Sequence, residues 1–203
     1  MLEFDTTVFH WINSHNAPWL DWLLWAASQP WSWAVVLTAA IVALCHGRPP
    51  AVWLWTLAGI GLCFLLADRI SVLCFKDVFC RLRPCHALEG VRMFRTSCGG
   101  QYGFVSSHAA NVFALALFLS LRRKRDRRPV ASTRLTNHGF QVLLILWACL
   151  VGYSRPYLGK HYPGDVLCGA LLGLLIGTAV FFIIQYLGQA TVKRPSQKKQ
   201  QQA

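Results

Sequence analysis

Four long runs without a charged side chain constrain the fold of this chain more than any other feature of its sequence. They cover residues 51–67, 105–121, 139–153 and 166–187. Each is near or a little short of the roughly 20 residues that a membrane-spanning helix needs. Helices of a water-soluble bundle would carry polar residues at every third or fourth position of their outer faces, and these runs lack that pattern. Because 55% of the residues are hydrophobic and only 14% are charged, we predict an all-α polytopic bundle of membrane helices.

The positive charges indicate how this bundle is oriented. The formal net charge is +12. Many basic residues crowd the loop after residue 121 and the polar tail after residue 188: Arg122, Arg123, Lys124, Arg125, Arg127, Arg128, Arg134, Lys193, Arg194, Lys198 and Lys199. Basic residues beside spanning helices are typical of the cytoplasmic side. This topology explains the charge without a nucleic acid partner, and it places the loops 76–102 and 154–165 together on the outer face.

The first 45 residues combine an amphipathic start with an interrupted apolar stretch. The segment FDTTVFHWINSH predicts an interfacial helix, and the many tryptophans around it form an aromatic belt at headgroup level. Pro30 lacks an amide proton and disfavours a helical Gln29, so the apolar stretch up to residue 45 is either a short hairpin or one kinked span. We therefore predict five or six crossings. The chain divides into an interfacial helix and membrane hairpin (1–45), a membrane bundle with the functional site (46–188) and a basic cytoplasmic tail (189–203).

Small residues predict two local features. A glycine at every fourth position between 169 and 177 allows another helix to approach closely, and we expect that helix within the same bundle. The eight cysteines form no metal-binding pattern. Cys80, Cys85 and Cys98 share the outer loop, where a periplasm would permit oxidation. We hypothesise one disulfide among these three, with Cys85–Cys98 as the first choice.

The outer loops carry more cations than the positive-inside trend allows. Seven basic residues stand against three acidic ones: Lys76, Arg81, Arg83, Arg92, Arg95, Arg155 and Lys160, against Asp77, Glu89 and Asp165. An anionic ligand at the membrane surface is the simplest explanation, because Arg offers paired donors to phosphate oxygens and Lys a point charge. The sequence leaves open whether Asp77 and Arg81 shape the site. It also leaves open whether Asp68 and Arg69 support the site or are simply interfacial.

Two histidines stand among these cations, each at the start of an expected helix. His108 follows Ser106, a plausible N-cap, and the free amides of that first turn form an anion site. His161 precedes Pro163, a favoured first-turn residue, so Asp165 can reach back to one ring nitrogen of His161. That hydrogen bond would leave the other nitrogen free to attack. A nucleophilic histidine, a second histidine as acid and surrounding cations predict phosphoryl transfer through a phosphohistidine.

Three separated segments carry a more specific resemblance. They are Lys76, six intervening residues and then Arg83 and Pro84, next VSSH at 105–108, and last SRPYLGKHYPGD at 154–165. In order and spacing they resemble the three-part signature of the type 2 phosphatidic acid phosphatase superfamily, over roughly residues 50 to 187. The family's second part usually reads Pro-Ser-Gly-His, and Val105 and Ser107 replace its proline and glycine here. A side chain at position 107 hinders the closest backbone approach to a phosphate.

The resemblance implies a role for each matched residue. Phosphate would be bound by Lys76, Arg83 and Arg155, with help from Ser106 and the backbone around Ser107. His108 would be the general acid, and His161 would be the nucleophile, oriented by Asp165. The resemblance also implies that no metal ion or other cofactor is required.

The substrate is predicted from overall likeness to compact bacterial members of the superfamily. This likeness favours lipid A, with the 4′-phosphate ahead of the 1-phosphate. Undecaprenyl diphosphate comes second, and phosphatidylglycerophosphate is a further alternative. Arg92 and Arg95 suit a large anionic lipid. The implied location is the bacterial inner membrane with the site facing the periplasm, and the sequence does not indicate an oligomeric state.

A function of another class would be a non-catalytic lipid-phosphate binder or transporter subunit. Such a protein would keep the cations of the outer loops. It would need neither the pair His108 and His161 nor an aspartate four residues after His161. The combination therefore favours an enzyme.

Overall fold

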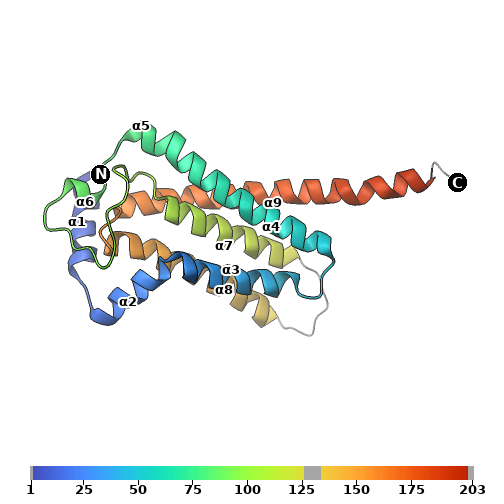
Figure 1. The fold of residues 1–203 in the computed structure, drawn as a ribbon, viewed down its shortest axis with the longest axis horizontal. Helices are drawn as coiled ribbons and strands as arrows, with labels where there is room; N and C mark the ends of the chain where they lie inside the picture. Colours follow the sequence, from blue (N-terminus) through green and yellow to red (C-terminus); the bar gives the residue numbers. More distant parts are fainter. Residues whose placement is uncertain (1, 126–133, 201–203) are drawn as a thin grey trace.

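The computed structural model describes residues 2–125 and 134–200, with the side chains of residues 2, 134–137 and 190–200 left aside. Regular structure in these parts is helical: α1 (Leu2–Ser14), α2 (Pro18–Ala27), α3 (Pro30–Cys45), α4 (Pro50–Ile70), the π-helical segment η1 (Ser71–Lys76), α5 (Asp77–Phe79), α6 (Pro84–Ala87), α7 (Ser107–Arg125), α8 (Arg134–Tyr157) and α9 (Pro163–Gln200). The long helices α3, α4, α7, α8 and α9 run alongside one another, as Figure 1 shows. The all-α bundle predicted from the uncharged runs is confirmed.

Helix α7 lies at the centre of this bundle and packs against α4, α8 and α9. Its contact with α9 depends on the glycine repeat. A Cβ added at Gly177 would lie 2.5 Å from the Ala114 carbonyl oxygen, and one at Gly173 would collide with the Ala110 carbonyl oxygen. Since only glycine leaves room for the α7 backbone, the repeat serves packing inside the bundle, as predicted.

Three helical stretches are long and apolar enough to cross a membrane: Pro50–Phe79, His138–Tyr157 and Pro163–Gln189. The pair α2 and α3 makes a fourth if it counts as one broken span. Central helix α7 is 19 residues long and ends in four basic residues, which leaves too few uncharged positions for the same criterion. The chain is a multi-pass membrane protein, and the count of five or six crossings stays a prediction.

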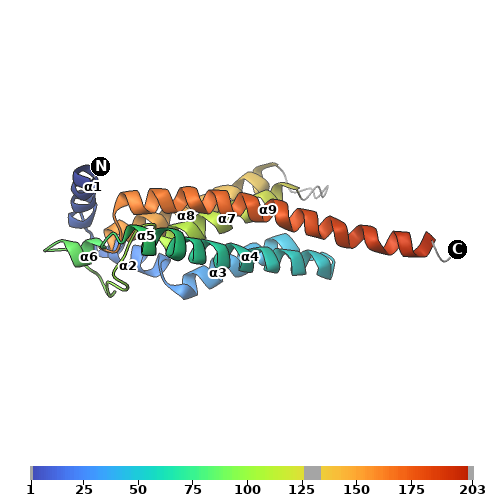
Figure 2. The same cartoon turned by 90° about the horizontal axis from the view of Figure 1, so that it is seen from above.

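The break between α2 and α3 falls at Ser28 and Gln29, directly before Pro30, as expected. The two helices meet at 63°, and α3 continues away from α2 in Figure 1. Residues 18–45 therefore form a bent pair and not the antiparallel hairpin that was one of the two predicted alternatives. Helix α1 lies across the end of the bundle in both Figure 1 and Figure 2.

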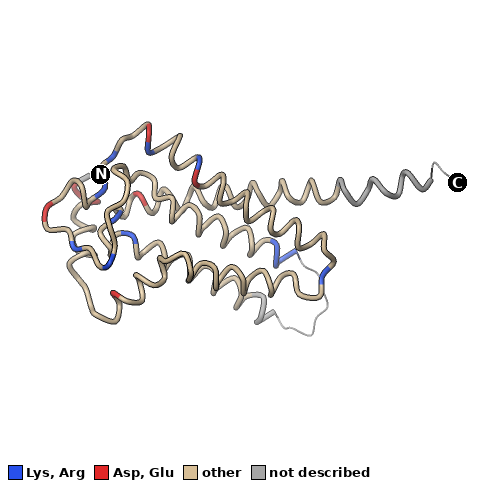
Figure 3. The backbone as a smooth tube through the Cα atoms, in the orientation of Figure 1, with Lys and Arg blue, Asp and Glu red and all other residues tan. Residues whose placement is uncertain are grey.

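Charged residues gather at the two ends of the bundle, and Figure 3 shows few of their positions between the ends. The basic end includes Arg122 to Arg125 in the last turn of α7. Arg127 and Arg128 lie outside the described residues. The predicted tail begins within α9, whose backbone continues to Gln200.

The opposite end is closed by the loop between α5 and α7, which is clamped to its neighbours. Arg92 donates to both oxygens of Asp21, at 2.8 and 2.5 Å, and Tyr157 donates to the same carboxylate at 2.7 Å. Asn13 of α1 accepts from the Arg92 amide at 2.9 Å. The Arg92 guanidinium is thus paired with Asp21 and holds the loop to α2, while its contact with a large anionic lipid stays a prediction.

A disulfide also braces this loop. Cys85 and Cys98 are bonded to each other, which confirms the pairing hypothesised from the sequence. Cys80 is a free thiol. The two arms of the loop also meet where the Arg83 amide donates to the Gln101 carbonyl at 3.1 Å. These links fix Arg83 relative to the start of α7.

Candidate active site

A cavity of about 340 Å³ opens at the end of the bundle closed by the outer loop. Its lining comes from the α2–α3 bend, α4, η1, the loop and α7: Ser28, Pro30, Trp33, Asp68, Lys76, Arg83, Ser107, His108 and Asn111. Four of these were predicted site residues, namely Lys76, Arg83, Ser107 and His108. The first two parts of the sequence signature therefore meet around one space.

Lys76 is positioned by a change in helix geometry. Helix α4 passes into η1, whose wider π-helical turns are frequent at functional sites. Lys76 Nζ donates to Ser107 Oγ at 2.6 Å, and this hydroxyl lies 2.6 Å from Ser71 Oγ. Ser107 occupies the place of the family's glycine, and its hydroxyl holds the Lys76 ammonium at the start of α7.

His108 is the second residue of α7 and lines the cavity. Its ring meets Trp33 edge to face, with ring centroids 5.5 Å apart. One turn later, Asn111 donates to the Ser107 carbonyl at 3.0 Å, while its buried Oδ1 has no partner among the described residues. The open cavity side of His108 and the unpartnered amide oxygen leave polar groups available for a ligand.

Ser106 is buried beneath this surface. Its Oγ accepts from the Ala109 amide at 3.4 Å, so it caps α7 as predicted. The Ser106 amide donates to the Asp165 carbonyl at 3.0 Å, which ties the start of α7 to the start of α9. Ser106 does not line the cavity, so its position supports a capping role and gives no direct contact for phosphate.

Arg155 lies near the end of α8 and is only 1% exposed. Its Nε donates to Ser154 Oγ at 3.2 Å, but Nη2 is buried without a partner among the described residues. Arg155 forms no ion pair within those residues. Burying a guanidinium in this way is costly unless an anion completes its contacts. Arg155 therefore fits a phosphate-binding group.

His161 and Asp165 are both buried where α8 leads into α9. Helix α9 begins at Pro163 and carries Asp165 in its first turn, as expected. His161 Nδ1 lies 3.5 Å from Asp165 Oδ2 and has no hydrogen-bond partner among the described residues. The predicted hydrogen bond is not formed here. Other donors hold Asp165, since Oδ1 accepts from Arg81 at 2.7 Å and Oδ2 from the Tyr162 amide at 3.1 Å.

Burial and the surrounding cations together determine the charge of His161. Burial, and next the positive charges of Arg83, Arg155 and Lys76, hold the pKa of His161 well below its usual value of 6.5. The imidazole is therefore neutral near pH 7. Burial and the charges of Arg155 and Arg83 also lower the pKa of Lys160, to about 8. The sequence-predicted cations thus act on one another across all three parts of the signature.

Several residues of the site were not assigned from the sequence. Trp33 and Asn111 line the cavity, and so does Asp68, whose role was left open. Asn111 stands four residues after Ser107 on the same helix face, a spacing that could have indicated it. Arg81 contacts Asp165 directly, and Asp5 of α1 contacts Arg81. No sequence pattern connects Asp5 with the rest of the site.

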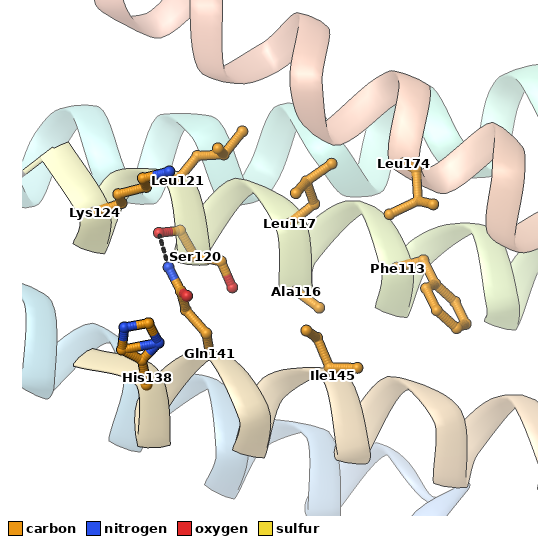
Figure 4. A pocket seen from close by; sticks show the side chains of 10 residues that line it. All are labelled: Phe113, Ala116, Leu117, Ser120, Leu121, Lys124, His138, Gln141, Ile145 and Leu174. Atoms are coloured by element: carbon orange, nitrogen blue, oxygen red, sulfur yellow. Dashed lines mark hydrogen bonds between the residues drawn. The ribbon is translucent and has the colours of Figure 1, made fainter. Parts of the chain in front are cut away.

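A second cavity, of about 570 Å³, lies along the other half of α7 and is shown in Figure 4. Its walls combine Phe113, Ile145 and Leu174 with polar Ser120 and Gln141, which face one another from α7 and α8. It contains none of the predicted site residues. The larger cavity is therefore separate from the cationic cluster, and the smaller one is the candidate active site.

One group of side chains has the composition of a metal site. The ligand atoms of Cys85, His86 and Cys98 lie within 4.8 Å of one another. The two sulfur atoms are joined in a disulfide, and a cysteine sulfur is a good metal ligand only as a free thiolate. We therefore assign no metal to this group.

Comparisons with known proteins show which family the chain resembles. The family model described as the PAP2 superfamily matches residues 52–189. A lipid A 4′-phosphatase of Porphyromonas gingivalis is 30% identical over 97% of this chain and 81% of its own length. A lipid A 4′-phosphatase of Bacteroides thetaiotaomicron is 31% identical over 92% of this chain and 81% of its own length.

A solved structure supports the fold. The transmembrane PAP2 type phosphatidylglycerolphosphate phosphatase of Bacillus subtilis superposes with a TM-score of 0.65 at 19% identity, over 93% of this chain and 86% of that one. The family model covers well over half of the sequence, and the relatives align with nearly all of it. The chain belongs to the PAP2 superfamily.

Proposed function

We propose that this chain removes a phosphate from lipid A, the 4′-phosphate ahead of the 1-phosphate, through a phosphohistidine formed on His161. The two relatives named above support the substrate. The observation that carries the chemistry is a buried imidazole whose pKa is held well below 6.5, beside Asp165 and within a cluster of cations. A neutral imidazole has the lone pair that a nucleophile needs.

In the first step, His161 attacks phosphorus. Nδ1 faces Asp165, so Nε2 forms the new nitrogen–phosphorus bond while the bond from phosphorus to the lipid oxygen breaks. His108 gives a proton to that leaving oxygen. Lys76, Arg83 and Arg155 stabilise the charge on the equatorial phosphate oxygens. Contacts of this kind often tighten when substrate binds, so the 3.5 Å separation between His161 and Asp165 suits a resting state.

In the second step, water attacks the phosphohistidine. His108, now neutral, takes a proton from the water, and the nitrogen–phosphorus bond breaks. Inorganic phosphate leaves, and His161 recovers its lone pair. The two histidines thus return to their starting protonation states.

The proposed location is the bacterial inner membrane with the cavity facing the periplasm. The basic end of the bundle, around Arg122 to Arg125, supports this orientation because such residues favour the cytoplasm. The cavity at the opposite end would then meet lipid phosphates at the outer headgroup level. The oligomeric state has no part in this proposal.

Lipid A from Gram-negative cells that express the chain tests the substrate. We expect mass spectrometry to show the loss of one phosphate with the wild-type chain and none with His161→Ala at equal membrane abundance. Fragment ions should assign the loss to the 4′ end. Cells with the modified lipid should also bind cationic antimicrobial peptides less strongly, because the surface has lost negative charge.

Unchanged lipid A in both strains would reject lipid A as the substrate. Undecaprenyl diphosphate and then phosphatidylglycerophosphate would be assayed next with purified enzyme. Retained lipid phosphate binding with no turnover of any of them would favour a non-catalytic binder instead.

The pH dependence should depend on Lys160. Its pKa of about 8 means that the ammonium carries its charge below that pH and loses it above. With p-nitrophenyl phosphate, whose leaving group needs no proton from His108, we therefore expect kcat/KM to fall as the pH rises through about 8, because anion binding weakens. On the acid side kcat/KM should stay level until well below pH 6.5, since His161 remains neutral.

Lys160→Arg provides the control, because arginine keeps its charge throughout this range. The alkaline decline should move upward by more than one pH unit in that variant. An alkaline decline at the same pH in both enzymes would show that another group titrates.

A further inference from the structure

Three side chains connect the interfacial helix α1 with the candidate catalytic aspartate. Arg81 donates from Nη1 to Asp165 Oδ1 at 2.7 Å and from Nη2 to Asp5 Oδ2 at 2.6 Å. The Asp165 side chain is fully buried, and those of Arg81 and Asp5 are only 18% and 11% exposed. One guanidinium thus bridges two carboxylates that stand 160 residues apart in the sequence.

Asp5 also holds the turn from which Asp165 projects. Its Oδ1 accepts from the Gly164 amide, in the first turn of α9, at 2.7 Å. The carboxylate thus caps a helix to which it does not belong. A Cβ added at Gly164 would lie 2.8 Å from Asp5 Oδ2. Only glycine at this position admits the carboxylate so closely.

An aromatic contact keeps the same elements aligned. The Arg81 guanidinium lies over the Tyr162 ring, 4.0 Å from its centre. Phe9, fully buried on α1, packs against the same ring with centroids 5.6 Å apart. Arg81 and α1 therefore both contact the segment between His161 and Asp165.

We propose that Arg81 and Asp5 are positioning residues that act on His161 through Asp165, so that α1 belongs to the active site. The proposal rests on the proposed function. Arg81 occupies one oxygen of Asp165 and leaves the other, Oδ2, directed at His161 Nδ1. Asp5 partly neutralises the positive charge of Arg81. Arg81 therefore neutralises Asp165 less, and more of the negative charge of Asp165 can stabilise the phosphorylated imidazole.

Kinetics of the purified full chain in detergent micelles, with p-nitrophenyl phosphate as substrate, test this. We expect Asp5→Asn and Arg81→Gln each to lower kcat by about 10- to 100-fold with little change in KM, the loss typical of residues that orient a reacting group. The double variant should lose no more kcat than the less active of the two single variants, because both changes interrupt one chain of contacts. Asp5→Glu keeps the charge and should recover much of the activity.

The acid limb of kcat/KM separates positioning from general damage. Asp5→Asn removes a negative charge near His161 and should move that limb to lower pH. Arg81→Gln removes a positive charge and should move it to higher pH. The other charged or titratable groups around His161, namely Lys76, Arg83, Arg155, His108 and Asp165, are unchanged in each variant. A merely structural role would not produce opposite shifts.

Glu3→Gln is the matched control, because it also removes a negative charge from α1 but at an exposed side chain that makes no ion pair among the described residues. We expect it to retain wild-type kcat and pH profile. If Arg81→Gln does not yield folded protein, Gly164→Ala replaces it, since its Cβ displaces Asp5 without changing a charge. Wild-type kcat and an unshifted acid limb in Asp5→Asn would overturn the proposal. An inactive wild-type enzyme would instead reject the proposed function, and this inference with it.

Discussion

Replacing His161 with Ala should abolish the release of every leaving group, whereas replacing His108 with Ala should abolish only the release of poor ones. The two histidines belong to the same cluster. Their proposed roles differ, because a good leaving group in the substrate can make the acid unnecessary but cannot replace the nucleophile. A nucleophile has no substitute in the substrate. A general acid becomes dispensable when the departing oxygen is stable as an anion.

The His161→Ala enzyme should therefore lose at least about 10⁴-fold in kcat/KM, with an alkyl or an aryl phosphate alike, because no covalent intermediate can form. His161 is only 2% exposed, within the cationic cluster. A water molecule has no equivalent position from which to attack. Phosphate binding should persist, since Lys76, Arg83 and Arg155 are all retained.

The His108→Ala enzyme should behave differently with the two substrates. With a lipid phosphate, loss of the acid should lower the rate by about 10²- to 10⁴-fold. With p-nitrophenyl phosphate, the first step needs no proton, so about one equivalent of nitrophenolate should appear in a burst. Turnover should then be slow, because His108 is also the base that activates water in the second step.

Rapid-quench measurements with labelled substrate would resolve both variants. The acid-labile phosphoenzyme should accumulate in His108→Ala and be absent from His161→Ala. His10→Ala serves as the control, because His10 is exposed on α1 and should retain wild-type kinetics. Phosphoenzyme in the His161→Ala variant would place the covalent step on another residue.

The sequence predicted most of the site because the signature segments lie at the same end of the bundle. Counting crossings and loop charges was enough to place Lys76, His108 and His161 on one face. It was not enough to separate residues that line the cavity, such as Ser107, from those buried below it, such as Ser106. That difference depends on helix rotation, which a short motif at a helix start does not specify.

Charge counting also could not identify ion-pair partners. Arg92 was counted as an available cation, but Asp21 neutralises it from α2. Asp5 lies in the segment that predicted an interfacial helix, and its contact with Arg81 spans 76 residues of sequence. Periodicity describes neighbours within one helix, so contacts between α1 and the outer loop leave no trace in it. For the same reason Pro30 predicted the break before α3 but not the direction of the bend.

Arg155 gives the second large expected effect, and here stability and activity should change in opposite directions. Its guanidinium is 1% exposed, has one unpartnered nitrogen and pairs with no carboxylate among the described residues. A buried charge without a counter-ion destabilises the protein until an anion binds. Arg155→Met has a similar length and no charge. We expect it to lower kcat/KM by about 10³-fold, as loss of a preorganised donor does.

The same substitution should raise the melting temperature of the phosphate-free enzyme by about 2–4 °C for each kcal/mol of relieved desolvation. In the wild type, phosphate or orthovanadate should raise the melting temperature, because ligands that bind only the folded state stabilise it. Arg155→Met should lose most of that rise. Thermal unfolding in detergent is measured at the full anion concentration and again after 10-fold dilution of the anion. One preparation then gives both effects.

Arg95→Met controls for the removal of an outer arginine that is not buried. Arg95 stacks over Trp22 at 4.7 Å and lies outside the cavity, so its loss should leave the response to phosphate intact. If Arg155→Met responded to phosphate as strongly as the wild type, the unpartnered guanidinium would have another purpose, and Lys76 and Arg83 would have to bind the anion without it. If the variant were instead less stable than the wild type without phosphate, the buried charge would have an internal partner that stabilises it. Keeping Arg155 unpaired for substrate would then not destabilise the phosphate-free protein.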